Sequence, residues 1–224
     1  MQVSECSKSE GIIEAICCFN WEGISKADLL DVARIYYYFS VQFRENLQIA
    51  CDLYPEDKKL RELEAGECNT DNLSPWPGVA DAGEKMNHDE FMRRLLMLAQ
   101  VDDGHRDTLD HLGESYLRAI RKIEPEARAQ SIASYEDGGL ERVFRAFLRS
   151  SDWTYPALQA FRHFLLEHIK FDTDTAQGHG ALSRHLRPDD SKILPLWSEF
   201  QRALVSSVPS LLTGYEVHQR AAGD

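Results

Sequence analysis

The feature that most constrains this chain is a long run of apolar side chains at helical spacing. Between Ser25 and Ala50, apolar residues recur at positions 29, 32, 33, 36, 39, 43 and 47. Steps of three and four residues place these side chains on one face of an α-helix, whereas a strand would alternate every second residue. Ser25 is a suitable N-cap residue, and Asp28 follows three positions later. The pattern therefore predicts a long amphipathic helix.

Other segments show the same period and are separated by residues that interrupt helices. The expected helices span 55–67, 88–100, 107–122, 125–134, 140–148, 153–172 and 187–212, the last with Pro209 near its end. We therefore expect an all-α fold, a single-domain bundle of about seven to nine helices. Within that domain, residues 1–23 are expected to form an N-terminal extension, 68–87 a long loop and 213–224 a frayed tail. A loop as long as 68–87 is uncommon in a compact domain and suggests the mouth of a site.

Composition limits the kinds of molecule that this chain is expected to bind. The formal net charge of −12 disfavours nucleic acid and anionic membrane surfaces, because both would repel the chain on average. No apolar run approaches the roughly 20 residues that a membrane helix needs, so we expect a cytoplasmic protein. The five cysteines lack the Cys-x-x-Cys spacing of zinc or redox motifs and are expected to be reduced thiols. Cys68 is the one cysteine whose role stays open, because it directly follows Glu67, a candidate metal ligand.

Several carboxylates and imidazoles stand where helices begin or end. His168 and Asp172 are four residues apart and share one helical face. His179 lies eleven positions beyond His168, about three turns if the helix continues, although Gly178 and Gly180 equally allow a loop there. Glu67 ends a predicted helix, His88 starts the next, and Glu136 precedes a glycine pair. Oxygen and imidazole ligands from separate helices favour iron or manganese over structural zinc. The ordinary alternative for each is a surface residue or a surface ion pair.

Three stretches of the sequence resemble the heme-oxygenase-like superfamily. LLEHIKFDTDTAQGHGALSRHL is similar to the late helix of that superfamily, where His-x-x-x-Asp and a further His supply metal ligands. AGECNTDN followed by MNHDEFMRRLL resembles its Glu-then-His element, and SIASYEDGGLERVFRAFL resembles the stretch with its central Glu. The resemblance covers roughly residues 30–208 in the same order.

The resemblance implies a non-heme di-iron oxidase or oxygenase that activates O2 to oxidise a small organic substrate. It implies two Fe ions, with Mn as the alternative, held by Glu67, His88, Glu136, His168, Asp172 and His179. The chain departs from the family at Thr175, where a third ligand of the late helix is expected. Asp81 or Glu84 would replace Glu67 if the long loop folded over the site. Tyr36, Tyr37 and Phe39 are expected to line the cavity, although such a run of aromatic residues is also typical of a core.

Two other functions stay open. A metal-free enzyme or small-ligand-binding protein of the same fold would use the polar cluster to hold an organic molecule. A non-catalytic helical partner protein would instead leave Glu136 and His168 pointing to water. Heme degradation is disfavoured, because members of the superfamily with that activity have an axial histidine in the first helix and residues 1–50 contain none. The oligomeric state is open between a monomer and a homodimer.

Overall fold

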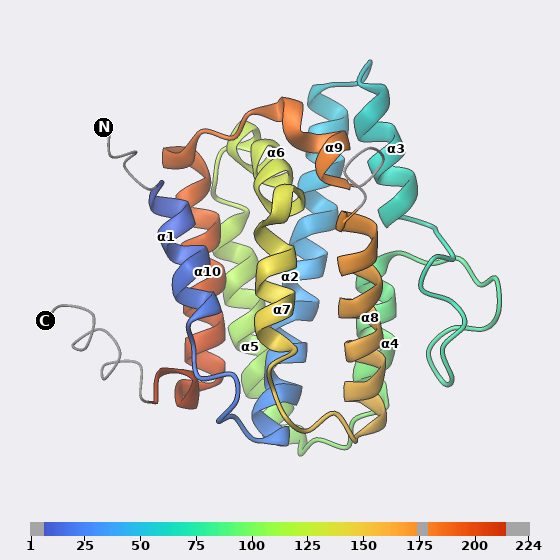
Figure 1. Cartoon of the computed structure of the whole chain (residues 1–224), viewed down its shortest axis with the longest axis vertical. Coiled ribbons are helices and arrows are strands. Elements are labelled where there is room, and N and C mark those ends of the chain that lie inside the picture. The colour runs from blue at the N-terminus through green and yellow to red at the C-terminus, as the bar shows by residue number, and fades with distance from the viewer. Residues whose placement is uncertain (1–6, 174–178, 214–224) are drawn as a thin grey trace, which may run out of the picture.

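The computed structural model describes residues 7–173 and 179–213, and the side chains of 171–179 lie outside that description. Helices stand side by side in an upright bundle (Figure 1), which confirms the predicted all-α, single-domain fold. The elements are α1 Lys8–Cys17, α2 Lys26–Leu53, α3 Lys58–Glu67, α4 His88–Met97, α5 Asp103–Ile120, α6 Pro125–Ser134, the kinked turn η1 Tyr135–Gly139, α7 Leu140–Phe147, α8 Pro156–Thr173, α9 His179–Ser183, η2 Arg184–Leu186, α10 Asp190–Ser207 and η3 Pro209–Leu212.

Helix α2 runs through the bundle and contacts α4, α5, α6, α8 and α10. Its N-terminus has the predicted cap, since the Asp28 amide donates to Ser25 Oγ at 3.1 Å and the Ser25 amide donates to Asp28 Oδ2 at 2.9 Å. Tyr36 lies near the middle of α2. Its ring centroid is between 5.5 and 6.5 Å from the ring centroids of Phe144, Phe161, Phe164 and Phe200. The core therefore forms where α2 meets α7, α8 and α10.

The expectation that residues 1–23 form an extension is wrong for the described part of that segment. Helix α1 packs against α7 and α10, and Ile13, Ile16, Phe19 and Trp21 are buried. The Trp21 indole donates to the Ile16 carbonyl at 2.8 Å, which ties the chain after α1 to the helix. Because the helix has only ten residues, its sequence shows too few turns for the apolar period to stand out.

Predicted helix ends agree with the structure where a strong local signal exists. Helix α4 begins at His88 and α6 spans Pro125–Ser134, as expected. Helix α5 begins at Asp103, earlier than predicted, because Asp102 accepts the His105 amide at 3.1 Å. Helix α8 begins at Pro156, later than predicted, because the Asp152 carboxylate bonds to Thr154 instead of capping a helix.

In the described residues, no helix is both long enough and apolar enough to cross a membrane.

The long loop 68–87 leaves the bundle beside α4 and α8 (Figure 1) and returns to its starting point. Thr70 and Met86 exchange two backbone hydrogen bonds, of 3.1 and 2.9 Å. The Asn69 amide donates to Asn87 Oδ1 at 2.9 Å, immediately beside the start of α4. These contacts close the loop, so the C-terminus of α3 and the N-terminus of α4 are held together.

Candidate metal centre

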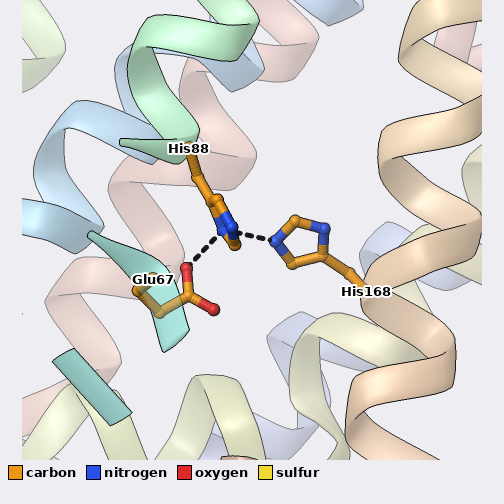
Figure 2. A group of neighbouring side chains, drawn as sticks. All are labelled: Glu67, His88 and His168. Carbon is orange, nitrogen blue, oxygen red and sulfur yellow. Dashed lines mark hydrogen bonds and ion pairs between the residues drawn. The ribbon is translucent and has the colours of Figure 1, made fainter. Parts of the chain in front are cut away.

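Three buried side chains from three different helices converge on one point (Figure 2). Glu67 is the last residue of α3, His88 is the first residue of α4, and His168 lies in α8. Their exposed fractions are 5%, 6% and 7%. Loop closure brings Glu67 and His88 together, and the packing of α8 against α4 adds His168.

The ligand atoms of this group lie close enough to share one ion. His88 Nδ1 is 2.6 Å from Glu67 Oε2 and 2.9 Å from His168 Nε2. One donor atom from each of the three residues falls within 4.8 Å of the other two. Two imidazole nitrogens and one carboxylate oxygen therefore meet in the interior of the bundle.

The opposite ring nitrogens are also held, and their partners fix where the protons lie. His168 Nδ1 is 2.8 Å from the Phe164 carbonyl oxygen, which can only accept, so Nδ1 carries the proton. His88 Nε2 is 3.0 Å from Asn72 Oδ1. Each ring thus donates through its outer nitrogen, which leaves the inner nitrogen of the neutral ring with a lone pair directed at the centre.

This arrangement is stabilised by a proton or a metal ion at its centre. Two lone pairs and a carboxylate that face one another in a buried site repel unless a proton or a metal ion lies between them. A metal ion satisfies all three donors at once, and the donor set of two imidazoles and a carboxylate suits Fe(II) and related divalent ions. The residues present therefore fit a metal centre.

The pocket around this centre is small and mostly apolar. Tyr36, Phe43, Leu140 and Phe164 form much of its wall. The free space is about 20 Å³, enough for roughly one water molecule. As it stands, the pocket has room for a ligand of the size of water or O2, and an organic substrate requires side chains to move.

Polar side chains also reach the pocket beside the ligands. Arg44 Nε donates to Asp89 Oδ2 at 2.9 Å, and both residues line the pocket with Cys68. Burial, together with the nearby Glu67 carboxylate, raises the pKa of the Cys68 thiol to about 12. Among the described residues, the compact group of candidate donor atoms contains nitrogen and oxygen only, and Cys68 is not part of it.

Glu136 lines the same pocket but lies outside the compact group of three ligand atoms. It is buried and belongs to η1, a kink between α6 and α7 in which Asp137 and Gly138 leave the helical conformation and Gly138 has a φ of 91°. That backbone conformation favours glycine. Helix α9 packs against η1, and a Cβ atom added to Gly180 would lie 2.8 Å from the Glu136 carbonyl oxygen. The glycine at 180 therefore allows α9 to approach Glu136 closely.

The remaining candidate ligands divide into two groups. The side chains of Asp172 and His179, and all of Thr175, lie outside the described residues. Asp81 and Glu84 do not replace Glu67, because Asp81 is exposed and Glu84 forms an ion pair with Arg94 at 2.8 Å. The long loop closes on itself and does not fold its acidic residues over the centre.

Of the three aromatic residues expected to line the cavity, only Tyr36 does so. Tyr37 lines a separate hollow with Arg34 and Arg93, since one step along a helix turns a side chain by about 100°. Phe39 is buried in the core, with its ring 4.5 Å from that of Phe200. The three aromatic side chains therefore lie in three different environments.

Sequence reasoning missed Asn72 and the Phe164 carbonyl, the two groups that orient the histidines. Asn72 lies in an irregular loop with no periodic pattern, so only its contacts identify it. Arg44 and Asp89 were missed as pocket residues for a similar reason, because charged residues on helices are usually exposed.

Comparison of the chain with protein family models, with curated proteins and with solved structures found no match. The function is therefore argued from the geometry of the centre.

Proposed function

We propose that this protein is a non-heme iron oxidase or oxygenase that uses O2 to oxidise a small organic substrate. Glu67, His88 and His168 would hold one Fe(II) ion. The observation that carries the proposal is the convergence of His88 Nδ1, His168 Nε2 and Glu67 Oε2. Both rings are already oriented by oxygen acceptors, as metal-binding imidazoles usually are.

The donor set supports iron in particular. Two histidines and one carboxylate would supply three donors to the ion, and the same donor set serves many non-heme Fe(II) oxygenases that bind O2 and substrate. Catalytic zinc uses similar donors, and manganese is a further candidate. Metal content and reactivity with O2 distinguish iron from these ions.

A second ion is part of the proposal. Glu136 is buried and lines the same pocket. Asp172 and His179 are further candidate ligands by the resemblance to the heme-oxygenase-like superfamily. With Glu136 they would hold the second iron.

The bound iron would supply the activation of O2, and the residues of the chain would prepare the site for it. The Phe164 carbonyl and Asn72 hold the outer imidazole protons, so both inner nitrogens stay available as ligands. Tyr36, Phe43 and Leu140 give the pocket an apolar wall, which would limit the entry of bulk water. Arg44 and Asp89 add an ion pair of 2.9 Å to the lining of the pocket.

The burial of Glu136 and His168 weighs against a non-catalytic partner protein, because that interpretation requires both side chains to point to water. A metal-free ligand-binding protein would also bury them. Only the iron oxidase is expected to bind metal, so a measurement of metal binding distinguishes these two functions.

The test is O2 consumption by protein reconstituted with Fe(II) under anaerobic conditions and then mixed with oxygenated buffer. We expect uptake of O2 by the parent protein and loss of uptake in His168→Ala and Glu67→Ala. His111→Ala is the control, since His111 is exposed on α5 and its Nδ1 lies 2.9 Å from the Asp107 carbonyl oxygen of the same helix. An iron-loaded parent that consumes no O2, or a His168→Ala variant that consumes it equally, would contradict the proposal.

A further inference from the structure

We propose that Asn72 is the positioning residue of the metal centre. It selects the ring nitrogen through which His88 binds metal, and it ties that ring to the end of the helix that carries Glu67. This inference rests on the proposed metal-binding function and identifies a residue of the long loop as part of the centre.

The side-chain amide of Asn72 bridges two ligand-bearing elements. Its Oδ1 lies 3.0 Å from His88 Nε2, and its Nδ2 donates to the Gly66 carbonyl at 2.9 Å. Gly66 immediately precedes Glu67 in the last turn of α3. One amide group therefore sets the position of the His88 ring relative to the Glu67 backbone.

The polarity of this amide determines the tautomer of His88. The Gly66 carbonyl can only accept, so the NH2 group of Asn72 faces Gly66 and the oxygen faces the ring. An oxygen at that position requires His88 Nε2 to carry a proton. The neutral tautomer with the proton on Nδ1 would place a lone pair against Asn72 Oδ1 and is disfavoured. His88 Nδ1 is thereby left as the metal-binding atom.

The loop that carries Asn72 is anchored at both ends and in the middle. Its ends are closed by the Thr70 and Met86 pair. In its middle, the Trp76 ring stacks on His163 of α8, with centroids 4.5 Å apart and planes inclined by 20°. His163 Nε2 also lies 3.1 Å from the Leu73 carbonyl. Since His168 belongs to α8 as well, the loop connects all three ligand-bearing helices and clamps the centre.

Substitutions of Asn72 distinguish the contributions of its hydrogen bonds to His88 and to Gly66. Asn72→Leu keeps a similar volume and removes both, while Asn72→Asp still accepts from His88 Nε2 but does not donate to Gly66. Asn72→Ala carries the same expectation as Asn72→Leu and serves if the leucine variant does not fold. Asp71→Ala is the control, because Asp71 is an exposed neighbour in the same loop.

The first readout is the proton on His88 in metal-free protein, by ¹⁵N NMR of the imidazole rings. We expect a slowly exchanging proton on His88 Nε2 in the parent protein, Asn72→Asp and Asp71→Ala, and its loss in Asn72→Leu and Asn72→Ala. The signal in the parent does not depend on whether metal binds. Its absence from the parent, or its persistence in both apolar variants, would overturn the inference.

The second readout is the affinity for Zn(II), a diamagnetic probe, by competition with a chelator. Loss of an outer hydrogen bond to a metal-binding histidine typically weakens affinity about 10- to 100-fold, and we expect this for Asn72→Leu. Asn72→Asp should fall between the parent and Asn72→Leu. Equal affinities in the parent and the apolar variants would also overturn the inference. A parent that shows the His88 Nε2 proton but binds neither Zn(II) nor Fe(II) would contradict the proposed function and leave the role of Asn72 in orienting the ring intact.

Discussion

His88 Nδ1 lies 2.9 Å from His168 Nε2, and neither imidazole is free to turn that nitrogen away. The outer nitrogen of each ring bonds to an oxygen acceptor, from Asn72 for His88 and from Phe164 for His168. These two nitrogens lie close together beside the Glu67 carboxylate, and a cation between them would stabilise the site. A metal ion or a proton between them would relieve their mutual repulsion.

Metal binding should stabilise the fold. At a free Zn(II) concentration of 100 times Kd, the linkage relation gives about 2.7 kcal/mol, which corresponds to roughly 5–10 °C in Tm for a domain of this size. Glu67→Ala should lose most of that shift, and Glu84→Ala should retain it, because Glu84 pairs with Arg94 away from the centre. Thermal unfolding followed by circular dichroism measures both. An equal shift in the two variants would argue against Glu67 as a ligand.

Metal affinity should fall as the pH falls. The imidazoles and the carboxylate bind metal only when deprotonated, so each displaced proton weakens the apparent affinity about tenfold per pH unit under conditions where that proton is bound. Calorimetric titration with Zn(II) in two buffers of different ionisation enthalpy counts the protons released. We expect release of at least one proton at pH 6. The same affinity at pH 5.5 and pH 7.5 would be incompatible with a site made of these three residues.

Gly180→Ala should disturb the turn that carries Glu136. The new Cβ atom would lie 2.8 Å from the Glu136 carbonyl oxygen, and backbone atoms cannot yield as a flexible side chain does. Overpacking of this kind costs about 1–3 kcal/mol, and urea unfolding would measure it. Gly11→Ala is the matched control, since a Cβ there meets nothing within 4 Å and alanine favours the α1 helix. Neutral behaviour of Gly180→Ala would show that α9 does not constrain Glu136.

The docking of α1 should weaken in acid. Asp190 accepts hydrogen bonds from the Ser7 and Ser9 side chains and from the backbone amides of Lys8 and Ser9, at 2.9 Å for each amide. These bonds lower the pKa of the Asp190 carboxyl well below its usual value of 3.8. Because the folded-state pKa is depressed, the stabilisation is present above pH 3.8 and is lost as the pH falls below it.

The Asp190 carboxylate is close to solvent, so the effect should be modest. We expect amide exchange in α1 to rise roughly threefold in Asp190→Asn at pH 6, in line with the small contribution of solvated charged contacts. Exchange in α5, which does not contain these partners, provides the internal control. Unchanged protection of α1 in the variant would show that apolar burial of Ile13 and Ile16 alone holds the helix.

The sequence predicted the helices well and the centre in part. Glu67, His88 and His168 stood out because imidazoles and carboxylates at helix ends or on a helical face are visible without coordinates. Their meeting point was not visible, since it depends on a loop closed by Thr70 and Met86. Helix α1 was too short for a clear period, and the kink beside Glu136 appeared only as a glycine break. Tertiary contacts decided each of these points.

The most direct measurement is the binding of Fe(II) under anaerobic conditions, by equilibrium dialysis of the parent protein and His168→Ala. We predict saturable binding that approaches two irons per chain in the parent, with loss of at least the ion held by Glu67, His88 and His168 in the variant. His111→Ala should bind as the parent does. No saturable binding by the parent, or equal binding by parent and His168→Ala, would contradict a metal centre at these residues.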